Sequence, residues 1–363
     1  MKIGDTWHRS VRFDAAEACI HILDQTVLPH RLQWISLSTP EDVAEAIVTM
    51  RVRGAPLIGA VAAYGFALAI RHDPSTAAIE TAFSQLLETR PTAVNLRWAL
   101  ERLHDAISAM PETERYGAAL KEADAIADED VRTCELIGEY GLQLLRQHWE
   151  QRKTGQARLN ILTHCNAGWF ATVDWGTALA PIYKAHDAGI PVHVWVDETR
   201  PRNQGAITAM ELALHGVPHT VITDNAGGLL MQRGEVDICI VGTDRTTAHG
   251  DVCNKIGTYL KALAAHDNGI PFFVGLPTST IDWRIERGSD IPIEDRAATE
   301  ITHINGIAQG QPHSVAIYPA DTAVANPAFD VTPNYLVTGL ITEWGVYAAS
   351  EDGLKKLQQD MLP

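Results

Sequence analysis

Short apolar segments alternate with helix-length intervals from Leu159 onward, and this alternation limits the possible folds more than any other feature. Such spacing is typical of β-α-β units, which build a parallel sheet with helices on both faces. Glycine-to-proline tripeptides at residues 189–191, 216–218 and 269–271 indicate where a helix stops and a strand begins. The expected strands are Leu159–Thr163, Val192–Val196, Thr220–Thr223, Asp237–Val241, Pro271–Val274 and Ser314–Ile317.

The first 150 residues have a different pattern, which predicts a mainly helical domain with a short strand pair. The strands are expected at Val11–Asp14 and Cys19–Asp24, and helical periodicity covers Thr39–Met50, Leu57–Ile70 and Ala119–Gln147. A polar segment, residues 150–158, separates the two patterns. The sequence therefore predicts an α/β protein with a helical domain over residues 1–150 and a sheet domain over residues 151–363.

Composition excludes several classes of protein. The chain has 363 residues, of which 46% are hydrophobic and 20% charged, as in soluble globular proteins. Its formal net charge of -16 opposes sequence-independent binding to nucleic acid or to an acidic membrane. The N-terminal segment, residues 1–13, has no apolar core of signal-peptide length, and no apolar run approaches the roughly 20 residues of a membrane span. Five scattered cysteines without a C-x-x-C pair favour neither disulfides nor a zinc ribbon. A cytoplasmic protein is expected.

Polar residues follow the expected strands, at the sheet edge where α/β proteins bind ligands. Asp244 follows the apolar segment 238–241, and Asn254 and Lys255 are expected in the first turn of a helix, where free N–H groups and a cation could hold a phosphate. The alternative is a solvated loop before a surface helix.

Cys165 follows the first sheet strand in the same way. A nearby cation or a helix N-terminus can lower a thiol pKa enough to populate the thiolate, which could act as base, acid or nucleophile. The alternative is a small buried hydrophobe. His164 is interpreted as a turn residue.

The second sheet strand ends in a polar segment, residues 197–205. Gln204 could reach a sugar hydroxyl, whereas Asp197 and Arg200 could form an ion pair that only orders the loop. Asp224 precedes what is interpreted as a structural helix N-cap.

In the helical domain, Arg53 with the N–H groups of Gly54 and Ala55 would form an anion seat before a helix. Arg90 precedes another helix start, and its alternative role is a solvated charge. The glycines match neither the dinucleotide nor the P-loop motif, and no hydrolase or metal-ligand motif is found.

Several motifs together resemble the methylthioribose-1-phosphate isomerases of methionine salvage, a family homologous to the alpha, beta and delta regulatory subunits of the translation initiation factor 2B complex. They are Arg53-Gly54-Ala55-Pro56, residues 90–96, Thr163-His164-Cys165-Asn166, residues 197–201, Gly250-Asp251, residues 254–258 and residues 326–333.

The resemblance implies a Rossmann-like C-terminal domain, a homodimer, and neither a metal nor an organic cofactor. It implies a sugar phosphate as partner, with no nucleic acid and no membrane. Cys165 and Asp244 correspond to the catalytic pair. The substrate contacts correspond to Arg53, Gly54, Ala55, Arg90, Gln204, Asn254 and Lys255.

The chain departs from the family at three places that could reshape its pocket. An arginine is missing after Ala206, Trp169 and Phe170 stand where smaller side chains are usual, and Trp344 replaces an arginine. Related enzymes act on 5-deoxyribose 1-phosphate or ribose 1,5-bisphosphate, which stay open as substrates. A non-catalytic regulatory or sugar-phosphate-sensing subunit is the other alternative.

Overall fold

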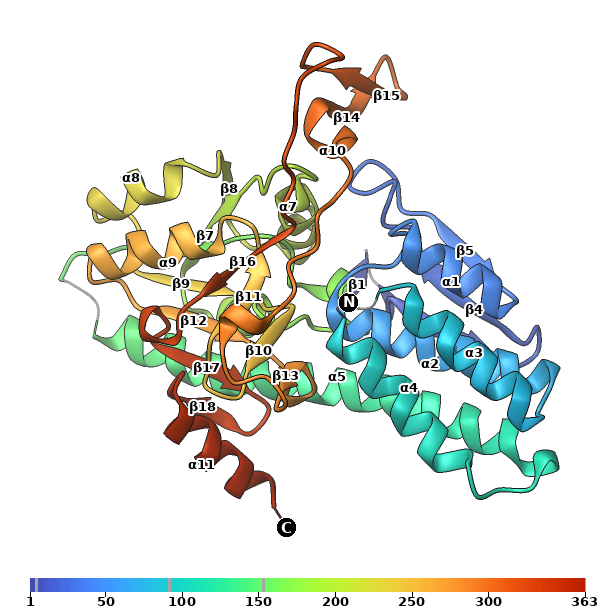
Figure 1. Ribbon diagram of the computed structural model, residues 1–363. Helices are drawn as coiled ribbons and strands as arrows, with labels where there is room; N and C mark the ends of the chain where they lie inside the picture. Colours follow the sequence, from blue (N-terminus) through green and yellow to red (C-terminus); the bar gives the residue numbers. More distant parts are fainter. Residues whose placement is uncertain (4–5, 91–92, 152–153, 363) are drawn as a thin grey trace.

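The computed structural model describes residues 1–3, 6–90, 93–151 and 154–362, which form a helical N-terminal part and a sheet-based C-terminal part (Figure 1). Helix α5 (Glu112–Glu150) runs along both parts. Its first half packs into the helical core through Ala119 and Ala123, and its second half packs into the sheet core through Ile137 and Leu145. The domain boundary after residue 150 stays a prediction, and residues 152–153 of the polar segment lie outside the described residues.

The N-terminal part combines a small antiparallel sheet with a layer of helices. The predicted strand pair is confirmed as β3 (Val11–Asp14) and β4 (Cys19–Leu23), and β5 (Trp34–Leu37) adds a strand that the sequence analysis missed. β1 (Lys2–Ile3) and β2 (Thr6–Trp7) pair separately. The helices are α1 (Pro40–Val48), α2 (Ala55–His72), α3 (Thr76–Glu88), α4 (Val94–Ile107) and α5.

Helix α2 is the central helix of this part. By length and composition alone it could cross a membrane, but most of its residues are buried against α4 and α5. Its apolar surface on all sides is therefore that of a core helix.

The C-terminal part is built on a twisted sheet in the order β18-β17-β12-β9-β6-β7-β8, in which only the β17–β18 pair is antiparallel. The strands are β6 (Leu159–Thr163), β7 (Val192–Asp197), β8 (His219–Ile222), β9 (Ile238–Val241), β12 (Phe272–Gly275), β17 (Gly339–Thr342) and β18 (Gly345–Tyr347). The chain builds outward from β6 to β8 and then returns to place β9 on the other side of β6. The strand order thus reverses between β6 and β9, which is where doubly wound sheets bind ligands.

Helices cover both faces of this sheet, which confirms the predicted α/β fold (Figure 1). On β6, Ile161 points into one apolar core and its neighbour Leu162 into the other. Both faces of the sheet are therefore shielded from water, as a strand of continuous apolar residues requires. The helices are α6 (Ala180–Asp187), α7 (Gln204–His215), α8 (Ala226–Gln232), α9 (Thr258–Asp267) and α11 (Glu351–Met361).

The strand predicted at Ser314–Ile317 does not belong to this sheet, and that prediction is wrong. These residues overlap β15 (Gln311–Ala316), which forms an exposed hairpin with β14 (His303–Ala308) after the short helix α10 (Thr299–Thr302). Gln309 and Gly310 both have positive φ and form the tight turn between the strands. The sheet takes β17 in its place.

A second small sheet, ordered β13-β10-β11-β16, lies beside the main one. Its strands are β13 (Ile281–Asp282), β10 (Arg245–Thr247), β11 (Val252–Lys255) and β16 (Phe329–Thr332). Asn254 and Lys255 are thus in a strand and not in the first turn of a helix, because α9 begins only at Thr258. Gly257, with φ of 102°, makes the turn between β11 and α9.

Candidate active site

A cavity lies at the carboxyl edge of the main sheet and extends to the helical part. Cys165 reaches it from the end of β6, and Asp244 reaches it from the segment after the adjacent strand β9. The two residues therefore flank the point where the strand order reverses. All predicted site residues line the cavity: Cys165, Asp244, Arg53, Gly54, Ala55, Arg90, Gln204, Asn254 and Lys255.

Cys165 is held in a left-handed turn with φ of 68°. Its N–H donates to Thr199 Oγ1 over 2.9 Å, and its carbonyl accepts from the Thr208 hydroxyl over 2.8 Å. Burial raises the pKa of the thiol, and the positive charges of Lys255 and Arg53 oppose that rise. The net direction is opposite to the lowering that would populate a resting thiolate.

Asp244 is fixed by its backbone, because its N–H donates to the carbonyl of Cys253 over 2.9 Å. Burial raises the pKa of this carboxyl, against the opposing effects of Lys255, Arg90 and Arg53. The group therefore takes up a proton at a higher pH than an exposed aspartate, as an acid catalyst needs.

The predicted anion seat is present at the start of α2. Gly54 has φ of 98°, and a Cβ there would lie 2.3 Å from the carbonyl oxygen of Ala171, so only glycine fits. Buried Arg53 donates from one Nη to Asn166 Oδ1 over 2.7 Å. The Nε atoms of Arg53 and Arg90 are buried without a hydrogen-bond partner among the described residues.

The other predicted contacts differ in how firmly the protein holds them. Arg90 lies 3.5 Å from Glu294 Oε2, while residues 91–92 of its motif lie outside the described residues. Lys255 Nζ donates to the carbonyl of Ala328 over 3.0 Å. Asn254 donates to Thr258 Oγ1 over 3.0 Å, whereas Gln204 Oε1 is buried without a partner in the described part of the chain.

The sequence analysis missed a buried carboxyl behind the anion seat. Glu211 of α7 accepts from the N–H of Phe170 over 2.7 Å and from the Asn166 amide over 3.0 Å. Burial raises its pKa to about 7. Asn166 thus links Glu211 to Arg53. The available signal was a glutamate on the apolar face of a helix, one turn after Ile207.

The comparisons with known proteins agree with this geometry. The sequence model of the "Initiation factor 2 subunit family" matches residues 51–349. The methylthioribose-1-phosphate isomerase of Acidiphilium cryptum is 62% identical, over 99% of this chain and 98% of its own, and that of Escherichia coli is 55% identical, over 99% and 97%. The chain belongs to the methylthioribose-1-phosphate isomerase family.

Solved structures confirm this fold. The 5-methylthioribose 1-phosphate isomerase of Pyrococcus horikoshii has a TM-score of 0.82 at 40% identity and covers 99% of both chains. The translation initiation factor eIF-2B subunit delta from A. fulgidus has a TM-score of 0.78 at 38% identity, over 97% of this chain and 100% of that one. The predicted relation to both groups is therefore confirmed.

The aromatic departures from the family pattern do not reshape the cavity directly. Trp169 and Phe170 are fully buried in the sheet core, and Trp344 is exposed. None of these three is among the residues that line the cavity in the described part of the chain.

The loop after β7 is ordered differently from the prediction. Asp197 and Arg200 do not form the ion pair that was one possibility for this loop, because Asp197 faces His164 and Lys261 while Arg200 donates to the carbonyls of Pro201 and Ile301.

His164, Asp197 and Asp224 carry atoms that metals bind, and these atoms lie close together. However, Lys261 Nζ lies 3.3 Å from Asp197 Oδ2 and donates to the carbonyl of Asp224. An ammonium group therefore already neutralises this cluster, which makes it a poor metal site.

Proposed function

We propose that this protein converts 5-methylthioribose 1-phosphate to 5-methylthioribulose 1-phosphate in methionine salvage. The observation that carries the proposal is the position of Cys165 and Asp244 at the ends of adjacent strands, in one cavity that is also lined by basic side chains. The names of the relatives support the same reaction. The reaction needs an acid, a route for hydrogen between two carbons, and an anion seat.

Ring opening is the first chemical step, because the phosphate on the anomeric oxygen keeps the aldose closed. Asp244 gives its proton to the ring oxygen as the bond from C1 to that oxygen breaks. The raised pKa of Asp244 suits this role, since the carboxyl keeps its proton to a higher pH than an exposed aspartate does. The positive charge that develops at C1 then draws hydrogen from C2.

Hydrogen reaches C1 by one of two routes. In proton transfer, the Cys165 thiolate removes the C2 proton, an enediol-type phosphate forms, and the proton is returned to C1. In a hydride shift, hydrogen moves from C2 to C1 with its electron pair. In both routes the C2 hydroxyl loses its proton as the ketone forms, and that proton restores Asp244. The raised pKa of Cys165 favours the hydride shift, which needs no thiolate.

The donors that line the cavity suit the substrate phosphate. Arg53, Arg90 and Lys255 supply positive charge, and the start of α2 supplies the N–H groups of Gly54 and Ala55. Gln204 and Asn254 are assigned to the sugar hydroxyls. The unpartnered Nε atoms of both arginines support this assignment, because a buried donor without a partner is costly until a ligand fills the site.

Two other functions stay open for the test. 5-Deoxyribose 1-phosphate or ribose 1,5-bisphosphate would use the same chemistry with a different 5-substituent. The similarity to the eIF-2B delta subunit favours a non-catalytic regulatory role as the second candidate. A cytoplasmic homodimer completes the proposal, and light scattering of the purified protein would measure its mass.

The test is turnover of the three aldose phosphates by the purified protein, followed by nuclear magnetic resonance. We expect the ketose product from methylthioribose 1-phosphate at the highest kcat/KM. Deuterium placed at C2 separates the routes, because solvent hydrogen at C1 supports proton transfer whereas full retention supports the hydride shift. No turnover of any of the three substrates would reject the isomerase and favour the regulatory role.

A further inference from the structure

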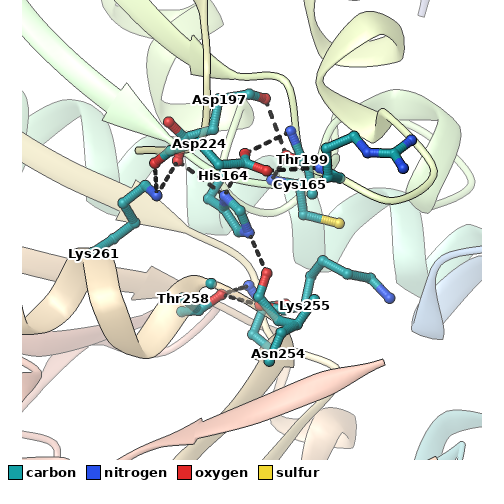
Figure 2. Close-up of polar contacts among 12 residues, drawn as sticks. His164, Cys165, Asp197, Thr199, Asp224, Asn254, Lys255, Thr258 and Lys261 are labelled. Atoms are coloured by element: carbon teal, nitrogen blue, oxygen red, sulfur yellow. Dashed lines mark hydrogen bonds and ion pairs between the residues drawn. The ribbon is translucent and has the colours of Figure 1, made fainter. Parts of the chain in front are cut away.

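His164 lies directly before Cys165 and bridges two elements of the site (Figure 2). Its Nδ1 lies 2.9 Å from Asp197 Oδ2 at the end of β7, and its Nε2 lies 2.9 Å from the carbonyl oxygen of Ile256. The imidazole is fully buried. It therefore spans from the main sheet to the turn between β11 and α9.

The proton on Nε2 is fixed by its partner, because a carbonyl oxygen can only accept a hydrogen bond. Asp197 anchors the other side of the ring and is itself held by Lys261, whose Nζ lies 3.3 Å away. Burial raises the pKa of Asp197, and His164 and Lys261 oppose that rise. The ring has one orientation, since both of its nitrogens face an oxygen.

The turn that His164 holds carries a residue of the proposed phosphate site. Ile256 directly follows Lys255, so the carbonyl that accepts from His164 is one residue from the lysine. Gly257 packs on the ring, because a Cβ there would lie 3.1 Å from the imidazole. The Gly257 N–H also donates to Asp330 Oδ2 over 2.7 Å, which fixes the other side of the turn.

We propose that His164 is a positioning residue that holds Lys255 at a fixed place relative to Cys165. The backbone of His164 is bonded directly to Cys165, and its ring donates to the carbonyl of Ile256, the residue after Lys255. The inference rests on the proposed function for its effect on turnover. Its effect on the Cys165 thiol can be measured without a substrate.

Charged groups surround both Cys165 and His164. Lys255, Arg53 and Asp244 act on the Cys165 thiol, and Lys255 is the largest of the opposing positive charges. The groups that face His164 are Asp197, Asp224, Lys261 and Asp330. Displacing Lys255 therefore raises the pKa of the thiol further, whereas a loss of packing that admits water lowers it, because burial is the largest cause of the present rise.

The experiment compares His164→Leu, His164→Gln and the control His193→Gln. His193 is another buried histidine, on β7, whose Nε2 lies 3.0 Å from Thr220 Oγ1 away from the cavity. Each variant is measured for kcat and KM, for thermal unfolding, and for the pH dependence of Cys165 alkylation by iodoacetamide, read by peptide mass spectrometry.

We expect His164→Leu to lower kcat by about 100-fold, the loss typical of a displaced catalytic group, and to move the alkylation midpoint to higher pH. His164→Gln keeps a donor for the Ile256 carbonyl and should recover at least about a tenth of wild-type kcat. His193→Gln should change unfolding only.

A folded His164→Leu with unchanged kcat and alkylation midpoint would overturn the proposal. If that variant does not fold, His164→Gln decides: a kcat below that of His193→Gln together with an alkylation midpoint at higher pH supports positioning, and a His164→Gln protein with the kcat and the alkylation midpoint of His193→Gln overturns it. If the wild type turns over no aldose phosphate, the proposed function fails, but the alkylation midpoint still decides the role of His164.

Discussion

A cysteine in the interior of the main sheet and a cysteine at its carboxyl edge have different surroundings. Cys239 lies within β9, is fully buried, and has its thiol pKa raised by burial. Cys165 lies just past the end of the adjacent strand, where burial also raises the pKa but Lys255 and Arg53 oppose it. Cys165 is partly exposed to the cavity and has two opposing cations, whereas Cys239 is fully buried, with Asp197 adding to the rise of its thiol pKa and Lys261 opposing it.

The two ends of β9 show the same contrast for carboxyl groups. Asp237 at the amino end accepts from the backbone N–H of Asn160 and the Gln156 amide, both over 2.7 Å. Asp244 beyond the carboxyl end lines the cavity with a raised pKa. Asp237 stabilises the start of the strand through hydrogen bonds, whereas Asp244 faces the space where a ligand would bind.

The largest expected effect separates the two thiols. If Cys165 transfers the C2 proton, Cys165→Ser should lower kcat by about 1,000-fold or more, because a hydroxyl is a far weaker acid and base than a thiol, whereas a hydride shift predicts a smaller loss. Cys239→Ser should leave kcat within about threefold and destabilise the fold by about 1–3 kcal/mol, since it buries a hydroxyl among apolar groups. Steady-state kinetics and urea unfolding of both variants measure this. Equal losses of kcat would remove the distinction between interior and edge.

The second effect compares the two carboxyl groups. Asp244→Asn keeps the shape but has no proton to give to the ring oxygen, so kcat should fall by about 100- to 10,000-fold. Asp237→Asn should lower stability by about 1 kcal/mol through weaker hydrogen bonds, with little change in kcat. A folded Asp244→Asn variant that retains most of its kcat would assign the acid to another group.

The strand ends could be predicted because their signals are local. A continuous apolar run followed by glycine and a polar residue marks both the strand and its end, and this was enough to place Cys165 and Asp244 at one edge. The remaining contacts were weak signals on their own, such as the anion seat at Arg53, and the family resemblance joined them into one set; they line the same cavity.

The rest could not be predicted because it depends on tertiary contacts. The segment at Ser314–Ile317 has the composition of a strand, but its partner is the preceding β14 and not the main sheet. The local sequence at Asn254 and Lys255 predicts the start of a helix, but in the fold β11 carries both residues and pairs with β10 on one side and β16 on the other. The bridge made by His164 joins residues 92 positions apart, which no local pattern encodes.

A smaller effect tests the buried carboxyl behind the edge. The pKa of Glu211 is raised from 4.5 to about 7, so the folded state binds its proton more tightly than the unfolded state. The free energy of unfolding should therefore fall as pH rises from about 4.5 to about 7, and Glu211→Gln should flatten this dependence. Asp130, whose pKa burial also raises to about 7, remains and keeps part of the slope. Urea unfolding at pH 5, 6, 7 and 8 measures it, and an unchanged slope would contradict the burial argument.

The smallest effect extends the comparison to the exposed hairpin. Val194 of β7 is fully buried, whereas Val315 of β15 is 57% exposed although it also lies in a regular strand. Val194→Thr should lower the free energy of unfolding by about 1–3 kcal/mol, because its hydroxyl has no partner in the apolar core. Val315→Thr should change it by less than about 0.5 kcal/mol, since the hydroxyl stays in water. The substitution is identical in both strands, so the difference between the two values measures burial and not strand propensity. A loss at Val315 as large as that at Val194 would mean that the hairpin is covered in solution, and the dependence of that loss on protein concentration would show whether a second copy covers it.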